Sequence, residues 1–234
     1  MSLNFLLQIA SAEPLAAASK TGVVEKSLWQ IVEDSNGSGG WIINLMLTLM
    51  LGYTIFVFVE RFLAVQKASK EDNNFLSKVK EYILDGKIDQ AKDYCNSSSS
   101  PSARMVEKGI SRLGKPLDNI AASIENTGKL EIMRLEQRLS FLATASGAGP
   151  MLGFLGTVLG MVGVFIALGD ATSLSVKIIA PGIMTAMITT VFGLIVGIIS
   201  FMGYNYLVGR IGKLVYKMEI TALEFMDLLN EPKK

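Results

Sequence analysis

The sequence contains no histidine and only one cysteine among its 234 residues. Histidine is the commonest general base and a frequent metal ligand, so its absence excludes His-based catalysis and His metal sites. Cys95 alone can form neither an internal disulfide nor a thiolate metal cage. We therefore expect no metal, no cofactor and no enzymatic activity, and a free thiol that suits a reducing compartment.

Charge is also missing from three long apolar runs, although 18% of the chain is charged and 50% is hydrophobic. Residues 41–59 carry no charge, and between residues 141 and 208 the only charges are Asp170 and Lys177. Runs of this length can cross roughly 30 Å of hydrocarbon. We predict membrane spans at 41–59, 141–168 and 178–208, joined by a short turn at 169–177. For the first run, the alternative is a buried helix of a soluble protein, which normally keeps a polar face.

The basic residues predict the orientation of these spans. Lys and Arg are frequent between residues 60 and 140 and recur after the third span at Arg210, Lys213 and Lys217, whereas only Lys20 and Lys26 precede Trp41. The positive-inside rule then places 60–140 and 209–234 in the cytoplasm, and the N-terminus and the 169–177 turn in the periplasm. We expect an all-α membrane protein with three spans, its N-terminus outside, its C-terminus inside, and long cytoplasmic helical extensions.

Helix signals divide the cytoplasmic region. Ser69 is suited to cap a helix that carries Phe75 and ends at Gly86, and Pro101 suits the first turn of another. From about Asp118 no strong helix breaker occurs before Gly147. This pattern predicts one helix rising from the cytoplasm into the second span, with a kink near Pro150.

The first forty residues form a separate segment that ends in the chain breaker at 36–40. Val24, Leu28, Ile31 and Val32 follow the spacing of an apolar helix face. We predict a periplasmic amphipathic helix on the membrane surface, and the alternative is a disordered tail.

Small and hydroxyl-bearing residues recur along the second and third spans. Glycines at helical spacing favour close helix approach, and prolines favour kinks. Threonines in a membrane helix often bond only their own backbone, but several on two adjacent spans indicate a wet or partner-facing surface. The predicted pore-lining residues are Thr157, Thr185, Thr189 and Thr190. The predicted kink and packing residues are Pro150, Gly153, Gly156, Gly160, Pro181, Gly182 and Gly193.

Neither of these two spans contains an acidic residue or a histidine. Intramembrane proton relays usually use carboxylates or histidine, so the chain cannot carry protons by a carboxylate of its own. One interpretation is a hydroxyl-lined wall for a partner's acidic helix. Another is a membrane scaffold that oligomerises through its glycine faces and conducts nothing. The same absence argues against an intramembrane enzyme.

The two spans resemble the ExbB/TolQ/MotA proton channel family. The resemblance rests on Pro150, Gly153, Phe154, the 156–158 Gly-Thr-Val triplet and Gly160 in the second span, and on the 180–183 Ala-Pro-Gly-Ile run, Ala186, Thr190, Gly193, Leu194 and Asn205 in the third. It is most specific over residues 130–206. Within the family the chain looks most like ExbB and then TolQ, and it lacks the fourth span of MotA-type stators.

The resemblance implies a homopentamer in the inner membrane around a dimeric single-span partner of ExbD or TolR type, whose membrane aspartate carries the proton. Thr157 and Thr190 match the family's two pore-facing threonines. The implied function is conversion of the proton motive force into work on a TonB-like protein for outer-membrane transport, or, in a TolQ-like role, for envelope maintenance. One position departs from the family: Thr185 stands where ExbB and TolQ usually carry a glutamate. This departure leaves open whether the transported ion is a proton or sodium.

Overall fold

The computed structural model describes residues 41–70, 74–170 and 175–230, and every regular element in these ranges is an α-helix. The first helix, α3, is Trp41–Ala68. Three short helices follow: α4 (Phe75–Leu84), α5 (Ile88–Ser97) and α6 (Pro101–Ile110). Three longer ones complete the chain: α7 (Leu117–Glu136), α8 (Leu139–Gly169) and α9 (Val176–Asn230). The predicted amphipathic helix at residues 24–32 lies outside the described residues.

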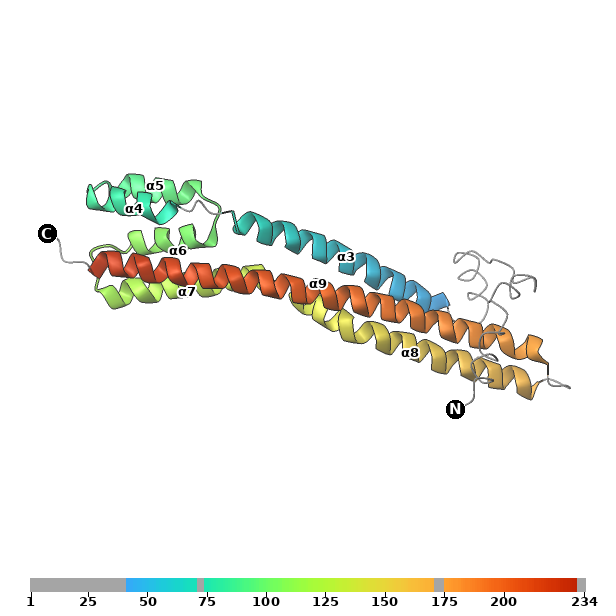
Figure 1. Ribbon diagram of the computed structural model, residues 1–234. Helices are drawn as coiled ribbons and strands as arrows, with labels where there is room; N and C mark the ends of the chain where they lie inside the picture. Colours follow the sequence, from blue (N-terminus) through green and yellow to red (C-terminus); the bar gives the residue numbers. More distant parts are fainter. Residues whose placement is uncertain (1–40, 71–73, 171–174, 231–234) are drawn as a thin grey trace, which may run out of the picture.

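The longest helix, α9, organises the molecule (Figure 1). Its 55 residues span about 80 Å at 1.5 Å per residue, far more than a bilayer needs. Helices α8 and α7 follow each other along α9, and α3 packs against α8 and α9 from another side. The short helices gather near the C-terminal end of α9 (Figure 1).

Three helical segments are long and apolar enough to cross a membrane: Trp41–Ala68, Leu117–Gly169 with α7 and α8 taken together, and Val176–Asn230. The prediction of an all-α membrane protein with three spans is therefore confirmed. Helix α3 continues past Val59 through Glu60 and Arg61 to Ala68.

Two details of the predicted helices were wrong. The chain from Leu117 to Gly169 is not one helix, because Gln137 and Arg138 separate α7 from α8, while α8 continues past Pro150. Ser69 does not cap the next helix: it follows the end of α3, and α4 begins at Phe75 with Asn74 as its N-cap residue. The helix break depends on Arg138, whose φ is 65°. Residue preferences do not predict a positive φ at an arginine, because this conformation is typical of glycine.

The short helices and the C-terminal half of α9 share one apolar core. Ser100 caps α6 by accepting a hydrogen bond from the backbone N–H of Ala103 at 3.1 Å, with Pro101 in the first turn. Gly109 lets the Phe225 ring of α9 approach closely, since an added Cβ would lie 2.6 Å from it. The fully buried members of this core include Val79, Ala91, Cys95, Val106, Leu214, Met218 and Phe225.

Candidate functional site

The closest helix contact in the molecule lies where α8 and α9 run antiparallel (Figure 1). A glycine row on α8 makes this contact, and each member is buried. A Cβ added at Gly149 would lie 2.9 Å from the Gly193 carbonyl oxygen, and one at Gly153 would lie 3.0 Å from the Thr189 carbonyl oxygen. One at Gly160 would lie 3.0 Å from both the Ala186 Cβ and the Gly182 carbonyl oxygen. The two backbones therefore touch, and a side chain at any of these glycine positions would force the helices to shift.

Small residues of α9 complete the contact. A Cβ added at Gly193 would lie 2.5 Å from the Gly149 carbonyl oxygen, and one at Gly182 would overlap the Val164 side chain. Gly197, which had not been singled out as a packing residue, accommodates the Pro150 ring, whose Cγ would lie 2.7 Å from an added Cβ. Pro181 lies inside α9 but is exposed, away from this contact.

Two of the threonines are buried within the chain. Thr189 has no exposed surface and packs against Gly156, and its hydroxyl donates to the Ala186 carbonyl at 2.9 Å. Thr185 is 2% exposed and donates to the Pro181 carbonyl at 3.0 Å. Both hydroxyls bond a carbonyl of their own helix. Thr189 faces α8, and neither side chain lies on an open surface of this chain.

The other two threonines lie at the edge of the contact. Thr190 is half-buried, and its hydroxyl contacts two carbonyls, that of Ala186 on its own helix at 3.2 Å and that of Gly153 on α8 at 3.3 Å. Thr157 is also half-buried, and its hydroxyl donates to the Phe154 carbonyl at 2.7 Å. Each hydroxyl keeps its acceptor lone pairs for a further donor, such as water.

Helix geometry places Thr157 and Thr190 on the same side of the α8–α9 pair. Successive residues are 100° apart, and in antiparallel helices the residues that follow the contact positions point to the same side. Thr157 follows Gly156, and Thr190 follows Thr189. The preceding positions point the opposite way: Leu152 and Phe192 pack on the cluster formed with α3. The two threonines therefore share the side of the pair that α3 does not cover.

Helix α3 is joined to this pair by a buried hydroxyl contact. The Thr54 hydroxyl lies 3.3 Å from the Ser200 hydroxyl, and neither residue has exposed surface. Thr54 was not singled out from the sequence. The only available signal was a hydroxyl in the middle of an apolar run, which is ordinary in membrane helices.

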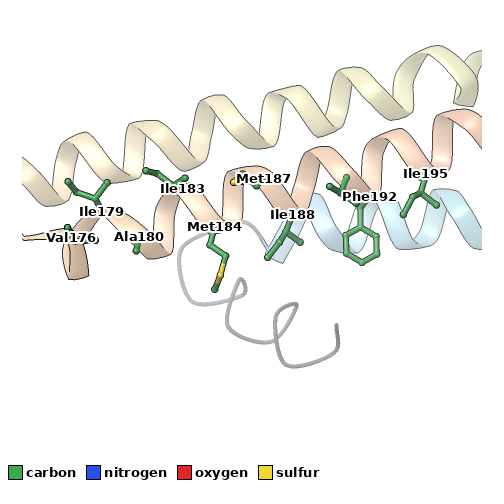
Figure 2. A pocket seen from close by; sticks show the side chains of 10 residues that line it. Val176, Ile179, Ala180, Ile183, Met184, Met187, Ile188, Phe192 and Ile195 are labelled. Carbon is green, nitrogen blue, oxygen red and sulfur yellow. The ribbon is translucent and has the colours of Figure 1, made fainter. Parts of the chain in front are cut away.

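A hollow along α9 offers no reactive groups among the described residues. It has a volume of about 940 Å³, and the described side chains that line it, between Val176 and Ile195, are all apolar. Figure 2 shows Met184, Ile188 and Phe192 on the side of α9 away from α8. Among the described residues there is also no cluster of Cys, Asp or Glu that could hold a metal ion. The chemistry that this region can supply is that of hydroxyls and backbone carbonyls.

Comparison with known proteins gives consistent matches. A model of the MotA/TolQ/ExbB proton channel family matches residues 97–220. The Tol-Pal system protein TolQ of Haemophilus influenzae is 40% identical over 100 residues, which are 43% of this chain and 44% of that protein. TolQ of Pseudomonas aeruginosa is 26% identical over 220 residues, 87% of this chain and 93% of that protein.

A third relative carries another name. The biopolymer transport protein ExbB of Salmonella typhimurium is 28% identical over 157 residues, which are 61% of this chain and 62% of that protein. The matches with the Haemophilus and Salmonella proteins thus span less than two thirds of each relative.

Proposed function

The chain belongs to the MotA/TolQ/ExbB proton channel family, and from this premise we propose that it is the multi-span subunit of an ion-driven machine of the ExbB/TolQ type. The observation that carries the proposal is the position of Thr157 and Thr190. Both lie on the one side of the α8–α9 pair that is free of α3, in spans that contain no acidic residue and no histidine. A surface of this kind can hydrogen-bond to water or to a partner's carboxylate, but it cannot itself carry a proton.

The titrating group is then supplied by a partner. We propose a homopentamer in the inner membrane whose α8–α9 faces enclose the single spans of a dimeric partner of ExbD or TolR type, with a membrane aspartate. Thr185 fits this division: it stands where ExbB and TolQ usually carry a glutamate, and its buried hydroxyl donates to the Pro181 carbonyl of its own helix. Each elementary charge that crosses releases about 2.3 kcal/mol per 100 mV of membrane potential, so a mechanical step needs several ions.

The work is delivered to a protein outside the membrane. We propose a TonB-like protein and transport across the outer membrane as the first candidate. A TolQ-like role in envelope maintenance is the second, and it is favoured by the match with TolQ of Pseudomonas aeruginosa along 93% of that protein.

The test is ion flux through the chain reconstituted in liposomes with a single-span partner of ExbD or TolR type. Thr157→Ala and Thr190→Val remove the hydroxyls, and we expect each to reduce partner-dependent flux at least about tenfold, or ~1.4 kcal/mol in the barrier. Thr157→Ser and Thr190→Ser keep a hydroxyl and should retain most of the flux.

Thr48→Val provides the matched control. Thr48 lies on α3, is exposed, and its hydroxyl donates to the Asn44 carbonyl at 2.7 Å, so like Thr157 it bonds a carbonyl of its own helix. The proposal predicts normal flux in this variant. If Thr157→Ala and Thr190→Val assemble normally and conduct as well as Thr48→Val, the threonine face is not the ion pathway. If the unsubstituted complex conducts no ions, the scaffold interpretation replaces the channel.

A further inference from the structure

A second polar cluster lies far from the threonines, at the break between α7 and α8. Helix α7 ends at Glu136 and α8 begins at Leu139. Arg138 has a φ of 65°, and it is the one non-glycine residue with positive φ in the described part of the chain. This conformation is unfavourable for any residue with a side chain. Its persistence here requires that surrounding contacts stabilise it.

Arg61 of α3 binds the end of α7. Arg61 is 8% exposed, and its Nη1 donates to the carbonyl oxygen of Arg134 at 3.1 Å. That carbonyl belongs to the last turn of α7, where backbone oxygens lack a helical partner and the helix dipole is negative. A buried guanidinium at this point therefore both satisfies the carbonyl and stabilises the helix end.

Glu60, the preceding residue of α3, joins Arg61 to the start of α8. One carboxylate oxygen accepts from Arg61 Nη2 at 2.8 Å, and the other accepts from Arg138 Nη1 at 2.6 Å. Two neighbouring residues of α3 thus contact both sides of the break. Charge-assisted bonds of this kind are short and directional, so they restrict the angle between the helices that they join.

The last turn of α7 is also fixed from its other side. Glu131 is 3% exposed, and its two oxygens accept from Arg104 Nη2 at 2.5 Å and from Arg134 Nη1 at 2.6 Å. The side chain of Arg134 is therefore bound to α6 through Glu131, while its carbonyl is bound to α3 through Arg61. This arrangement leaves the chain little freedom before Arg138.

From these contacts we infer that Glu60 and Arg61 are positioning residues, which fix the direction in which α8 leaves α7. Helix α8 carries Thr157, so its direction decides where that hydroxyl lies in an assembly. The contacts lie within one chain, and the inference does not depend on the proposed ion flux. It assigns a role to α3 beyond crossing the membrane: Glu60 and Arg61 near its end form a clamp on the junction between α7 and α8.

Spin-label distance measurements test the inference on the full chain in lipid. With Cys95→Ala as background, labels at Asn126→Cys on α7 and Thr144→Cys on α8 occupy exposed positions on either side of the break. Dilution with unlabelled chain leaves only distances within one chain. We expect one narrow distance distribution in the background chain and a distribution at least about twice as wide in Glu60→Gln.

Arg138→Gly separates the ion pair from the backbone. Glycine adopts positive φ without strain, so this variant allows the turn while it removes the bond to Glu60; it also frees the backbone there, which makes a narrow distribution in it the stricter test. The inference predicts a broad distribution in Arg138→Gly at an unchanged or higher melting temperature. The control is Glu136→Gln, which removes an exposed charge that has no ion pair in the described part of the chain, and it should leave the distribution narrow.

A narrow distribution in both Glu60→Gln and Arg138→Gly would show that the backbone turn alone sets the angle, and would overturn the inference. If Glu60→Gln does not fold, Arg138→Gly decides the question. The measurement needs neither partner nor ion gradient, so its failure would leave the proposed function untouched, and a failed flux experiment would leave the clamp untouched.

Discussion

Two neighbouring threonines on α9 differ in burial and in the residues that they contact. Thr189 is fully buried against Gly156, whereas Thr190 is half-buried and reaches across to the Gly153 carbonyl. The two residues are chemically identical, but they point about 100° apart. Both were predicted to line the pore. Within the chain Thr189 packs against α8, and we propose that Thr190 is the one that faces the pore. The same distinction separates Thr185, which is buried, from Thr157.

Cys95 is a buried residue whose reactivity can be predicted. It is 1% exposed, and burial, together with the charge of Glu107, raises the pKa of its thiol from 9.0 to about 12. The thiolate is the nucleophile, so the folded chain should react with iodoacetamide at pH 8 far more slowly, by at least about tenfold, than the chain unfolded in detergent. Mass spectrometry of the time course measures both rates.

The same pKa predicts a dependence of stability on pH. Below pH 9 the thiol is protonated in both states; as the pH rises from 9.0 towards about 12 the unfolded chain releases its proton and the folded chain does not. Stability should therefore fall with rising pH in this window, by about 1.4 kcal/mol per unit. Cys95→Ala should lack this component of the slope. Equal alkylation rates in the folded and unfolded chains, or the same slope in Cys95→Ala, would contradict the raised thiol pKa on which both predictions rest.

At the scale of elements, the approach of α8 to α9 is the most sensitive contact. Gly156→Ala would place a methyl group 2.5 Å from the Cβ of Thr189, which is fully buried and has no room to move. The helices must separate, and overpacking of this kind typically costs about 1–3 kcal/mol. We expect a lower melting temperature in detergent and weaker assembly of the chain.

Gly163→Ala is the matched control for this substitution. Gly163 lies in the same helix, but no atom outside the local backbone lies within 4 Å of an added Cβ. Alanine favours a helix over glycine by about 1 kcal/mol, so this variant should be unchanged or slightly more stable. A similar loss in both variants would show that helix flexibility, and not contact with α9, explains the glycines.

At the scale of the whole molecule, the structure is a long rod with its short helices at one end (Figure 1). A bilayer covers only about 30 Å of the roughly 80 Å of α9, so the remainder, with α4 to α7, must project on one side. The distribution of Lys and Arg predicts that this side is the cytoplasm.

Single cysteines in the Cys95→Ala background test this orientation. A membrane-impermeant maleimide applied to spheroplasts should label Asp170→Cys, at the α8–α9 end, and should label Tyr216→Cys only after the membrane is permeabilised. The opposite pattern would reverse the orientation and would place the clamp at the outer face. Labelling of both sites in intact spheroplasts would indicate leaky cells and calls for a fluorescent-protein fusion at the C-terminus.

Sequence patterns were sufficient for the features that depend on composition. The helical class and the three spans follow from uncharged runs long enough for a bilayer, where backbone groups must be satisfied within each segment. The glycine and proline positions could be singled out, and Gly197 follows Gly193 at helical spacing, but Thr54 could not, because its role depends on which atoms lie opposite. Likewise Glu60, Arg61 and Arg138 read as ordinary charges at the ends of helices.

By itself, the sequence determined that this protein crosses a membrane three times and that its second and third spans hold no titrating group, because both follow from which residues are present. Only the tertiary structure decided which threonines remain at the free side of the α8–α9 pair and where the chain bends at Arg138. These depend on helix rotation and on ion pairs between residues 78 positions apart, such as Glu60 and Arg138, and no local pattern encodes them.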